Sequence, residues 1–351
     1  MEIFKIIVNI IEIIIFIYLG FAAIYIFIFA IAGRIGYKPK NLLEKRKRKF
    51  AVLIPGYKED NVIIEVASEA LKQDYPTELF DVVIIADTFK KETLDKLAQL
   101  PIKLIEVSFT KSTKSKALNK AMEIIGNEYD IALILDADNI MEYQFLSKFN
   151  QAFDRGFVSV QGHRVAKNTN TNFAILDAVS EEINNHIYRL GHRALGLSSA
   201  LIGSGMAFEY SFFKSTMQKI DAVGGFDKEL ELRLLQGNKI IDYVEDALVY
   251  DEKVQNTEVF ENQRKRWLSA QFVYFNRYFL PGIKDLFLKG NIDFMDKVYQ
   301  MVQPPRILLL GLTTIFAAIS LLFYLLDFKL INELLIIDFS FWITIFILTF
   351  L

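Results

Sequence analysis

The sequence lacks cysteine and has only three histidines among its 351 residues. Without cysteine the chain has no disulfide, no thiol nucleophile and no zinc–thiolate site. Its histidines show no spacing that suggests a zinc site. The chain also has no excess of charge of one sign, because its 40 basic residues nearly balance its 42 acidic ones. The lack of cysteine agrees with a cytoplasmic domain, and no nucleic-acid partner is expected.

Hydrophobic residues, in contrast, are abundant: they make up 52% of the chain, with 31 phenylalanines and a mean hydropathy of +0.27. They concentrate in three runs, Ile13–Ala32, Ile307–Leu326 and Leu334–Leu351. The first two have about the length that spans a bilayer. The third contains Asp338 and ends with the chain, which leaves truncation open. We expect a transmembrane helix at 1–33, a cytoplasmic domain at 34–255, amphipathic interface helices at 256–306 and two transmembrane helices at 307–351.

A basic segment follows the first apolar run. Between Arg34 and Lys49 there are eight basic residues and one acid, Glu44. Short loops rich in Lys and Arg stay in the cytoplasm, so the amino terminus is expected outside and residues 34–306 inside. A cleaved signal peptide is the alternative, favoured by Ala30-Ile31-Ala32. The run is too long for the apolar core of a signal peptide and the basic segment resists export, which favours an uncleaved anchor.

Strand-like and helix-like segments alternate in the middle of the chain. Buried strands are predicted at 50–56, 80–87, 102–107 and 130–138, with helices at 61–72, near Thr93 and at 115–125. Such alternation indicates parallel βαβ units, an α/β fold of the Rossmann type. Ligands of these sheets bind beyond the carboxyl ends of the strands. Residues at those ends should therefore meet at one edge: Pro55-Gly56-Tyr57, Asp87, Asp136 and Asp138.

The pair Asp136 and Asp138 ends the fourth predicted strand, with Ala137 between them. Residues two apart in a strand share a face, so the pair can hold one hard divalent cation, Mg²⁺ or Mn²⁺. Such a cation neutralises charge on a leaving diphosphate. A turn, a helix cap and a phosphatase of the aspartate-nucleophile type are the alternatives. In that phosphatase, however, the motif normally ends the first strand.

Beyond residue 255 the pattern becomes amphipathic and aromatic, with Trp267, Phe272 and Tyr274 before a break at Pro281-Gly282. Helices of this composition next to a membrane span often lie in the interface plane. A pair of helices that packs on the core is the alternative.

Several motifs follow one another in a characteristic order: Ile54-Pro55-Gly56-Tyr57-Lys58-Glu59, Asp87, Lys116-Ala117-Leu118-Asn119, Asp136-Ala137-Asp138, Gly203-Ser204-Gly205-Met206-Ala207-Phe208 and Gln263-Arg264-Lys265-Arg266-Trp267. Over roughly residues 45–310 the chain resembles the membrane-integral branch of glycosyltransferase family 2. That branch has the GT-A nucleotide-sugar fold and includes the cellulose, hyaluronan and chitin synthases. The last pentapeptide is the most specific of the motifs.

The resemblance implies a role for each motif. Donor binding is expected from Pro55, Gly56, Tyr57, Glu59, Asp87, Lys116, Asp136, Arg264 and Arg266, and acceptor binding from Gly203, Ser204, Gly205, Gln263 and Trp267. The residue types themselves agree, since arginines suit a diphosphate and an indole offers a face to a sugar ring. A basic helix that anchors at anionic headgroups is the alternative for the last motif.

Inverting transfer needs a carboxylate that accepts a proton from the acceptor hydroxyl. In the family this base follows a Gly-Gly-Phe loop and begins a helix, which favours Glu229 here. Asp246, in Val244-Glu245-Asp246, is the alternative, and another acid also stays open. Glu229 could instead form an i,i+4 ion pair with Arg233. His163 could contact the donor or acceptor, or be an ordinary satisfied polar residue.

The sequence therefore predicts an inverting glycosyltransferase that moves a sugar from a nucleotide sugar, UDP-linked or other, to an acceptor hydroxyl. The acceptor is expected on a glycan or a lipid-linked glycan at the cytoplasmic face of the bilayer. Homo-oligomers or an export partner are further expectations, and both polymer extension and single-sugar transfer stay open. The alternative is a non-catalytic membrane module that binds a nucleotide or glycan and regulates a partner.

Overall fold

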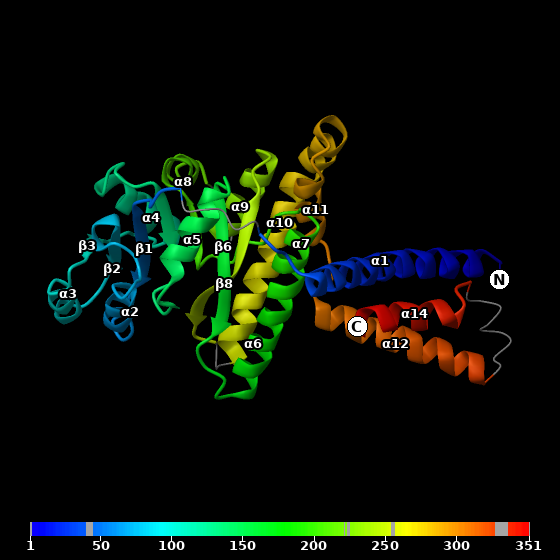
Figure 1. The fold of residues 1–351 in the computed structure, drawn as a ribbon. Coiled ribbons are helices and arrows are strands. Elements are labelled where there is room, and N and C mark those ends of the chain that lie inside the picture. Colours follow the sequence, from blue (N-terminus) through cyan, green and yellow to red (C-terminus); the bar gives the residue numbers. More distant parts are fainter. Residues whose placement is uncertain are drawn as a thin grey trace. The chain divides into compact units, whose positions relative to one another are not determined.

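A computed structural model describes residues 2–39, 45–220, 222, 225–253, 257–326 and 336–350, with only the backbone described for 257–263. The chain forms two compact units (Figure 1). One consists of Met1–Ile35 and Val302–Leu351, and the other of Gly36–Met301. The larger unit thus contains both the predicted cytoplasmic domain and most of the segment predicted as interface helices.

One eight-stranded sheet runs through the larger unit, in the order β3-β2-β1-β4-β7-β6-β8-β5 (Figure 1). Its strands are β1 (Phe50–Tyr57), β2 (Phe80–Asp87), β3 (Lys103–Val107), β4 (Ile131–Ile134), β5 (Ile140–Met141), β6 (Ser159–Ala166), β7 (Met206–Glu209) and β8 (Ile241–Asp251). β3, β2, β1 and β4 are parallel, as are β6 and β8, whereas β7 pairs antiparallel with β4 and β6. The predicted α/β class with a mainly parallel sheet is confirmed.

Helices cover both faces of this sheet. They are α2 (Ile63–Ala70), α3 (Lys91–Leu97), α4 (Lys114–Ile124), α5 (Phe145–Asp154), α6 (Asn172–Asn184), η2 (Asn185–Gly191), α7 (His192–Ala194), α8 (Tyr210–Met217), α9 (Phe226–Gln236), α10 (Thr257–Lys289) and α11 (Ile292–Gln300), with a short turn η1 (Thr77–Leu79). Alternate residues of β1 enter different cores: Ala51 and Leu53 pack with α4, α8 and α9, and Val52 and Ile54 pack with α2 and α5. Burial on both faces explains the continuous apolar runs of β1 and β2.

Two local predictions are wrong. The fourth strand ends at Ile134, and residues 136–139 form a turn closed by an Asn139 N–H to Asp136 carbonyl bond of 3.2 Å. The alternation of strand side chains therefore does not explain how the two aspartates meet. The second error concerns α10, which continues through Pro281.

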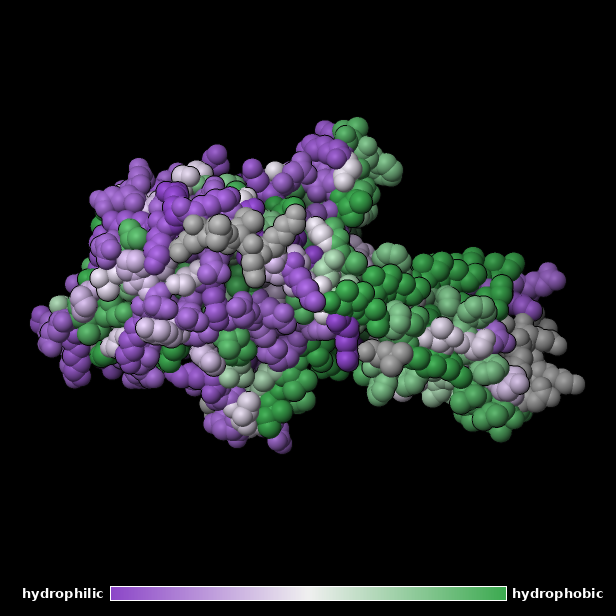
Figure 2. Space-filling view, viewed as in Figure 1, coloured by the Kyte–Doolittle hydropathy of each residue, from purple (hydrophilic) through white to green (hydrophobic). Residues whose placement is uncertain are grey.

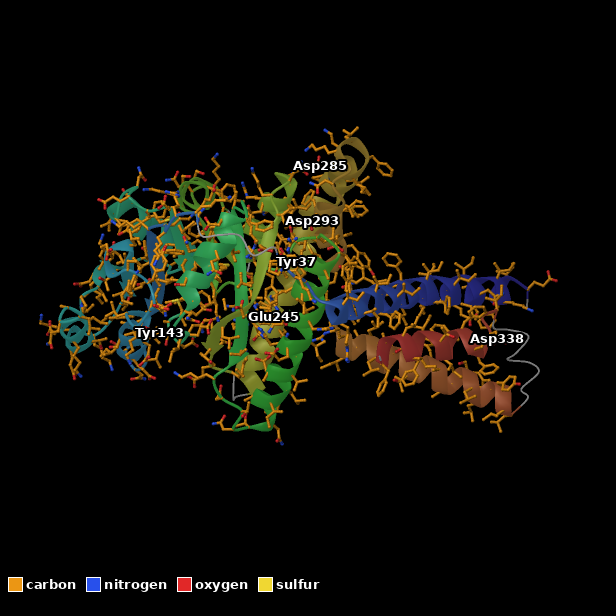
Figure 3. The ribbon with its side chains drawn as sticks, viewed as in Figure 1. Tyr37, Tyr143, Glu245, Asp285, Asp293 and Asp338 are labelled. Atoms are coloured by element: carbon orange, nitrogen blue, oxygen red, sulfur yellow. The ribbon has the colours of Figure 1, made fainter. Side chains whose placement is uncertain are left out.

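The reason α10 continues lies in its packing against α11. A Cβ on Gly282 would lie 3.3 Å from both Met295 Sδ and Val298 Cγ2 of α11, so glycine permits close contact between the helices. α11 is tied to the unit by Asp293, labelled in Figure 3, whose carboxylate accepts from the Ser198 N–H (2.9 Å) and hydroxyl (2.5 Å). Packing thus compensates for the backbone bond that proline removes.

The smaller unit consists of α1 (Glu2–Ile35), α12 (Arg306–Leu325) and α14 (Phe339–Phe350). By length and composition α1 and α12 could each cross a membrane, whereas α14 has 12 residues. Inside the unit Tyr18 donates to the Val302 carbonyl oxygen (2.7 Å), and Phe16 packs edge-on against Trp342. Hydrophobic side chains dominate the surface of these helices in Figure 2.

Candidate active site

The ends of β1, β2 and β4 lie together. The Lys58 N–H donates to the Asp87 carbonyl oxygen (3.1 Å), which joins the segment after β1 to the end of β2. A Cβ on Gly56 would lie 2.7 Å from Phe89 Cζ and 3.5 Å from Ala137 Cβ, so β1 also touches the aspartate turn. The predicted convergence is therefore present in the structure, while donor binding by Pro55, Gly56, Tyr57, Glu59 and Asp87 stays a prediction.

Asn139 holds the aspartate turn in place. Its side-chain amide donates to Asp138 Oδ1 and to Asp251 Oδ1, at 2.9 Å each, and its oxygen accepts from the Ser204 hydroxyl. Ser204 Oγ in turn accepts from the Asp136 N–H (2.9 Å). One buried amide thus connects both aspartates with the Gly203-Ser204-Gly205 loop.

The aspartate turn has the chemistry of a site for a hard cation. Burial raises the pKa of Asp138, and the carboxylates of Asp136 and Asp251 raise it further, to about 6. Such mutual repulsion favours a bound cation. Within the described ranges no group of three or more His, Cys, Asp or Glu side chains could hold a metal ion. Two carboxylates that leave coordination positions for phosphate oxygens and water fit Mg²⁺.

Lys114, which belongs to none of the sequence motifs, contacts this turn. Its ammonium group lies 2.5 Å from Asp136 Oδ1 and donates to the Gly203 carbonyl oxygen (2.8 Å). The predicted Lys116 instead donates to the Lys111 carbonyl oxygen (3.0 Å) in an exposed position. Positions two apart on a helix point about 200° apart, so only one of these lysines can face Asp136. The structure gives that place to Lys114.

Two carboxylates in the first turn of α9 have different surroundings. A Cβ on Gly203 would lie 3.6 Å from Asp227 Oδ2, so Asp227 faces the loop that Lys114 contacts. Burial raises the pKa of Asp227, and the neighbouring Lys228 and Lys114 oppose the rise only in part. Asp227 is therefore a carboxylate next to the aspartate turn, and its affinity for a proton is increased.

The predicted base, Glu229, has a different place. It is fully buried and accepts from Arg233 at 2.6 and 3.0 Å and from Arg277 at 3.4 Å. The i,i+4 pair with Arg233 is thus formed, and both carboxylate oxygens of Glu229 are engaged by arginines. The alternative, Asp246, has a side chain that is 76% exposed and lies near Lys148. Glu229 is thus engaged in ion pairs and Asp246 is exposed, and the assignment of either as the base stays a prediction.

In α10 the described side chains begin at Arg264. Of the Gln263–Trp267 motif, the side chain of Gln263 therefore lies outside the described part. Arg264 donates to Asp177 of α6 (2.9 Å) and lies over the Trp267 ring, 5.0 Å from its centroid. Arg266 is exposed. The structure therefore connects this motif to α6, and its predicted roles toward donor and acceptor stay predictions.

A buried ionic cluster extends from the aspartate turn to α6. Lys253 donates to Asp251 Oδ2 (2.9 Å) and to Glu181, and Arg164 donates to Glu181 Oε1 (2.8 Å). Burial raises the pKa of Glu181, but Arg164 and Lys253 outweigh this and lower it to about 2. Asn139 contacts the Asp251 end of this cluster. No sequence pattern indicated the cluster, because its members come from three separate elements.

His163 is a satisfied polar residue. Its Nδ1 donates to the Glu245 carbonyl oxygen (3.0 Å; Glu245 is labelled in Figure 3), and its Nε2 lies 3.0 Å from Glu182. Burial lowers the pKa of His163, but the carboxylate of Glu182 outweighs this, so the net shift is upward. Of its two predicted readings, the structure supports the ordinary one.

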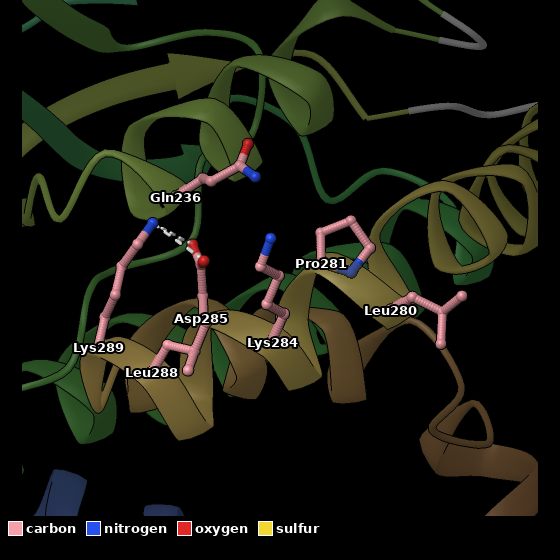
Figure 4. A pocket seen from close by; sticks show the side chains of 7 residues that line it. All are labelled: Gln236, Leu280, Pro281, Lys284, Asp285, Leu288 and Lys289. Carbon is pink, nitrogen blue, oxygen red and sulfur yellow. Dashed lines mark hydrogen bonds and ion pairs between the residues drawn. The ribbon is translucent and has the colours of Figure 1, made fainter.

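Two surface pockets differ in their relation to this site. One, of about 490 Å³, lies between the end of α9 and the second half of α10 (Figure 4) and contains none of the predicted site residues. Its lining includes the ion pair of Asp285 and Lys289. The other, of about 310 Å³, lies at the ends of β2 and β3 next to Asp87 and is lined by Ala86, Thr88, Phe89, Leu94, Glu106, Val107 and Ser108.

The family model described as "Glycosyltransferase like family 2" matches residues 47–270, which is more than half of the chain. The chain belongs to this family. Its sequence is 24% identical over 256 residues to beta-monoglucosyldiacylglycerol synthases of Trichormus variabilis and of a Nostoc species. The match covers 69% of this chain and 52% of theirs, so the chain spans about half the length of these curated relatives.

Among solved structures, this family 2 chain is similar to the mannosyltransferase PcManGT from Pyrobaculum calidifontis in complex with GDP-Man and Mn²⁺. The TM-score is 0.61 at 15% identity, and the match covers 98% of this chain and 99% of the other. At this identity the similarity shows the fold, which confirms the expected GT-A type of α/β domain with additional helices.

Proposed function

We propose that this protein is an inverting glycosyltransferase that transfers a sugar from a nucleotide-sugar donor, UDP-linked, to a lipid hydroxyl at the cytoplasmic membrane face. The proposal depends chiefly on one observation: Asp136, Lys114, Gly203 and Asp227 meet at the carboxyl ends of the parallel strands. The names of the diacylglycerol-glucosylating relatives favour a lipid acceptor. The Mn²⁺ and GDP-Man complex of the similar structure favours a divalent ion and a nucleotide sugar.

In this proposal Asp227 is the base. It takes the proton of the acceptor hydroxyl while that oxygen bonds to the anomeric carbon of the donor. The bond from this carbon to the β-phosphate oxygen breaks, and its electron pair leaves with the nucleoside diphosphate. Attack from the opposite side inverts the anomeric configuration. The raised pKa of Asp227 suits this role, since it brings the affinity for the proton closer to that needed at neutral pH.

The leaving diphosphate is held by residues at the strand ends. Asp136 and Asp138 would bind Mg²⁺ or Mn²⁺, which when bound supplies positive charge beside the diphosphate. Lys114 lies at Asp136 and adds a second cation. The pocket next to Asp87 has a size and a mixed lining that suit the nucleobase. Arg264 and Arg266 are proposed to approach the diphosphate once the donor is bound.

The test is release of UDP from a panel of UDP-sugars by the purified protein in lipid, with and without Mn²⁺. Asp138→Ala should abolish the metal-dependent release while the protein still unfolds at the wild-type temperature. Asp95→Ala, an exposed acid on α3, is the matched control and should keep full activity. Full activity of Asp138→Ala would contradict the proposal, and nucleotide binding without any release would favour the non-catalytic module.

A further inference from the structure

Lys114, the first residue of α4, connects three parts of the candidate active site. Its ammonium nitrogen lies 2.5 Å from Asp136 Oδ1 and donates to the Gly203 carbonyl oxygen at 2.8 Å. It also lies over the ring of Phe226, 5.7 Å from the centroid, directly before Asp227 in α9. The side chain of Lys114 is 26% exposed. One half-buried ammonium group is therefore shared by the aspartate turn, the Gly203 loop and the start of α9.

Asp136 is a partner for two different cations. It already accepts a hydrogen bond from Lys114, and in the proposed function it is also a ligand of Mg²⁺ or Mn²⁺ together with Asp138. The ammonium group neutralises the charge that makes this carboxylate a good ligand. Two cations a few ångströms apart also repel each other strongly in a partly buried site, where the effective dielectric constant is low. Lys114 on Asp136 thus lowers the affinity of the turn for a divalent ion.

A nucleoside diphosphate reverses this balance. Its phosphate oxygens are strong acceptors for an ammonium group. Lysine can follow them, because its charge lies at the end of a flexible four-carbon chain. By moving from Asp136 to the diphosphate, Lys114 keeps a charge-assisted hydrogen bond and frees the carboxylate. The buried cations Arg164 and Lys253, in contrast, are both bonded to Glu181, which fixes them away from such a move.

We infer that Lys114 exchanges between Asp136 and the donor diphosphate, and that this exchange makes tight binding of the divalent ion conditional on the nucleotide. The inference rests on the proposed function for the donor class, and it adds the residue that couples the nucleotide to the metal ligand. The same movement frees the Gly203 carbonyl oxygen, which lies at the loop that faces Asp227. The acceptor side of the site therefore changes only after the donor is bound.

The test measures two affinities that should change in opposite directions. Lys114→Met removes the charge and keeps an unbranched side chain. In the full chain without nucleotide, it should raise the affinity for Mn²⁺ about tenfold, the effect of one hydrogen bond to a charged group. In EDTA, the same variant should lower the affinity for UDP by about the same factor, because the diphosphate loses a cation. The electron paramagnetic resonance signal of hydrated Mn²⁺ reports the first affinity, and calorimetry the second.

Two further variants control the test. Lys120→Met removes a lysine from an exposed position of the same helix, where it is paired with Glu123 at 2.9 Å, and it should change neither affinity. Lys114→Gln retains a donor for the Gly203 carbonyl oxygen without the charge. It should show the same opposite changes as Lys114→Met, and it carries the test if the methionine variant does not fold. Thermal unfolding of each variant shows which of them can be compared.

An unchanged or lower Mn²⁺ affinity of the nucleotide-free Lys114 variants would overturn the inference. Loss of UDP affinity alone would make Lys114 a simple phosphate ligand, and loss of both affinities would make it a structural residue. Neither measurement needs sugar transfer. Opposite changes in a protein that releases no UDP from UDP-sugars would contradict the proposed function alone. Metal-dependent release without the rise in Mn²⁺ affinity would contradict this inference alone, and absence of Mn²⁺ binding with and without UDP would contradict both.

Discussion

Asp227 and Glu229 are two residues apart in α9, and the helix directs one to the Gly203 loop and the other to Arg233 and Arg277. We therefore expect Asp227→Asn to lower kcat for UDP release with acceptor by about 100-fold or more, because the base is lost. Glu229→Gln should keep kcat within a few-fold and lower the unfolding temperature, since two arginines lose a buried partner. Kinetics and thermal unfolding of both variants decide whether Asp227 or Glu229 is the base. A large loss of kcat in Glu229→Gln and a small one in Asp227→Asn would identify Glu229 as the base.

The same residue predicts a pH dependence. Burial raises the pKa of the Asp227 carboxyl above its ordinary value of 3.8. A protonated Asp227 cannot accept a proton, so kcat should fall as the pH drops through this raised pKa and level off above it. The acid limb of the kcat profile should disappear in the residual activity of Asp227→Asn. An identical limb in that variant would show that another group titrates.

Asn139 has a positioning role that no motif indicated. Asn139→Leu keeps the volume but removes the two donors that hold Asp138 and Asp251. Since partners of metal ligands typically contribute 10–100-fold to affinity, Mn²⁺ binding in the presence of UDP should weaken by about that factor in calorimetry. Asn150→Leu, another fully buried amide that bonds Arg46 and Arg48, is the matched control. It should lower stability without changing Mn²⁺ affinity.

At the scale of elements, the sequence pattern predicted the features that depend on residues close together in the sequence. β1 and β2 are buried on both faces, so their continuous apolar runs were enough to predict them as strands. The turn residues after each strand predicted the edge of the sheet at which the site lies. The antiparallel insertion of β7 between β4 and β6 depends on pairing of residues far apart in the sequence, such as Ile134 and Gln161, which both pair with Met206. Likewise Lys114 and Asn139 acquire their roles only from tertiary contacts. No window of sequence contains that information.

The Gly203-Ser204-Gly205 loop next to β7 gives a prediction at this scale. Gly205 has a φ of +59°, and a Cβ there would lie 2.6 Å from Val249 Cγ1 of β8. Gly205→Ala should therefore lower the free energy of unfolding by about 1–3 kcal/mol through backbone strain, with a further loss from the clash. In a Val249→Ala background the clash is relieved and only the strain remains. Denaturant unfolding of the four proteins in detergent measures both parts, and equal losses in both backgrounds would show that the contact is relaxed without cost.

At the scale of the whole molecule, the basic segment after α1 forms ion pairs in the folded unit and is also proposed to orient the chain in a membrane. In the folded larger unit Arg46, Arg48 and Lys49 pair with Asp130, Asp154 and Glu128. In the proposed membrane orientation, the same cations would act before folding, during membrane insertion, when topology is set. The ion pairs of these residues in the folded unit are therefore compatible with the proposed effect of the basic segment on orientation. The ion pairs and the orientation can be tested separately.

Orientation can be measured in intact cells with a membrane-impermeant maleimide, because each variant would contain one cysteine. If the basic segment stays in the cytoplasm, Glu2→Cys should be labelled from outside and Glu92→Cys only after the membrane is permeabilised. Replacing Lys38 and Lys47 by Gln removes two cations that none of the ion pairs above involves. It should increase labelling of Glu92→Cys in intact cells, since fewer charges then oppose export. External labelling of Glu92→Cys in the unmodified background would instead place the aspartate turn on the side away from the cytoplasm and exclude the proposed membrane face.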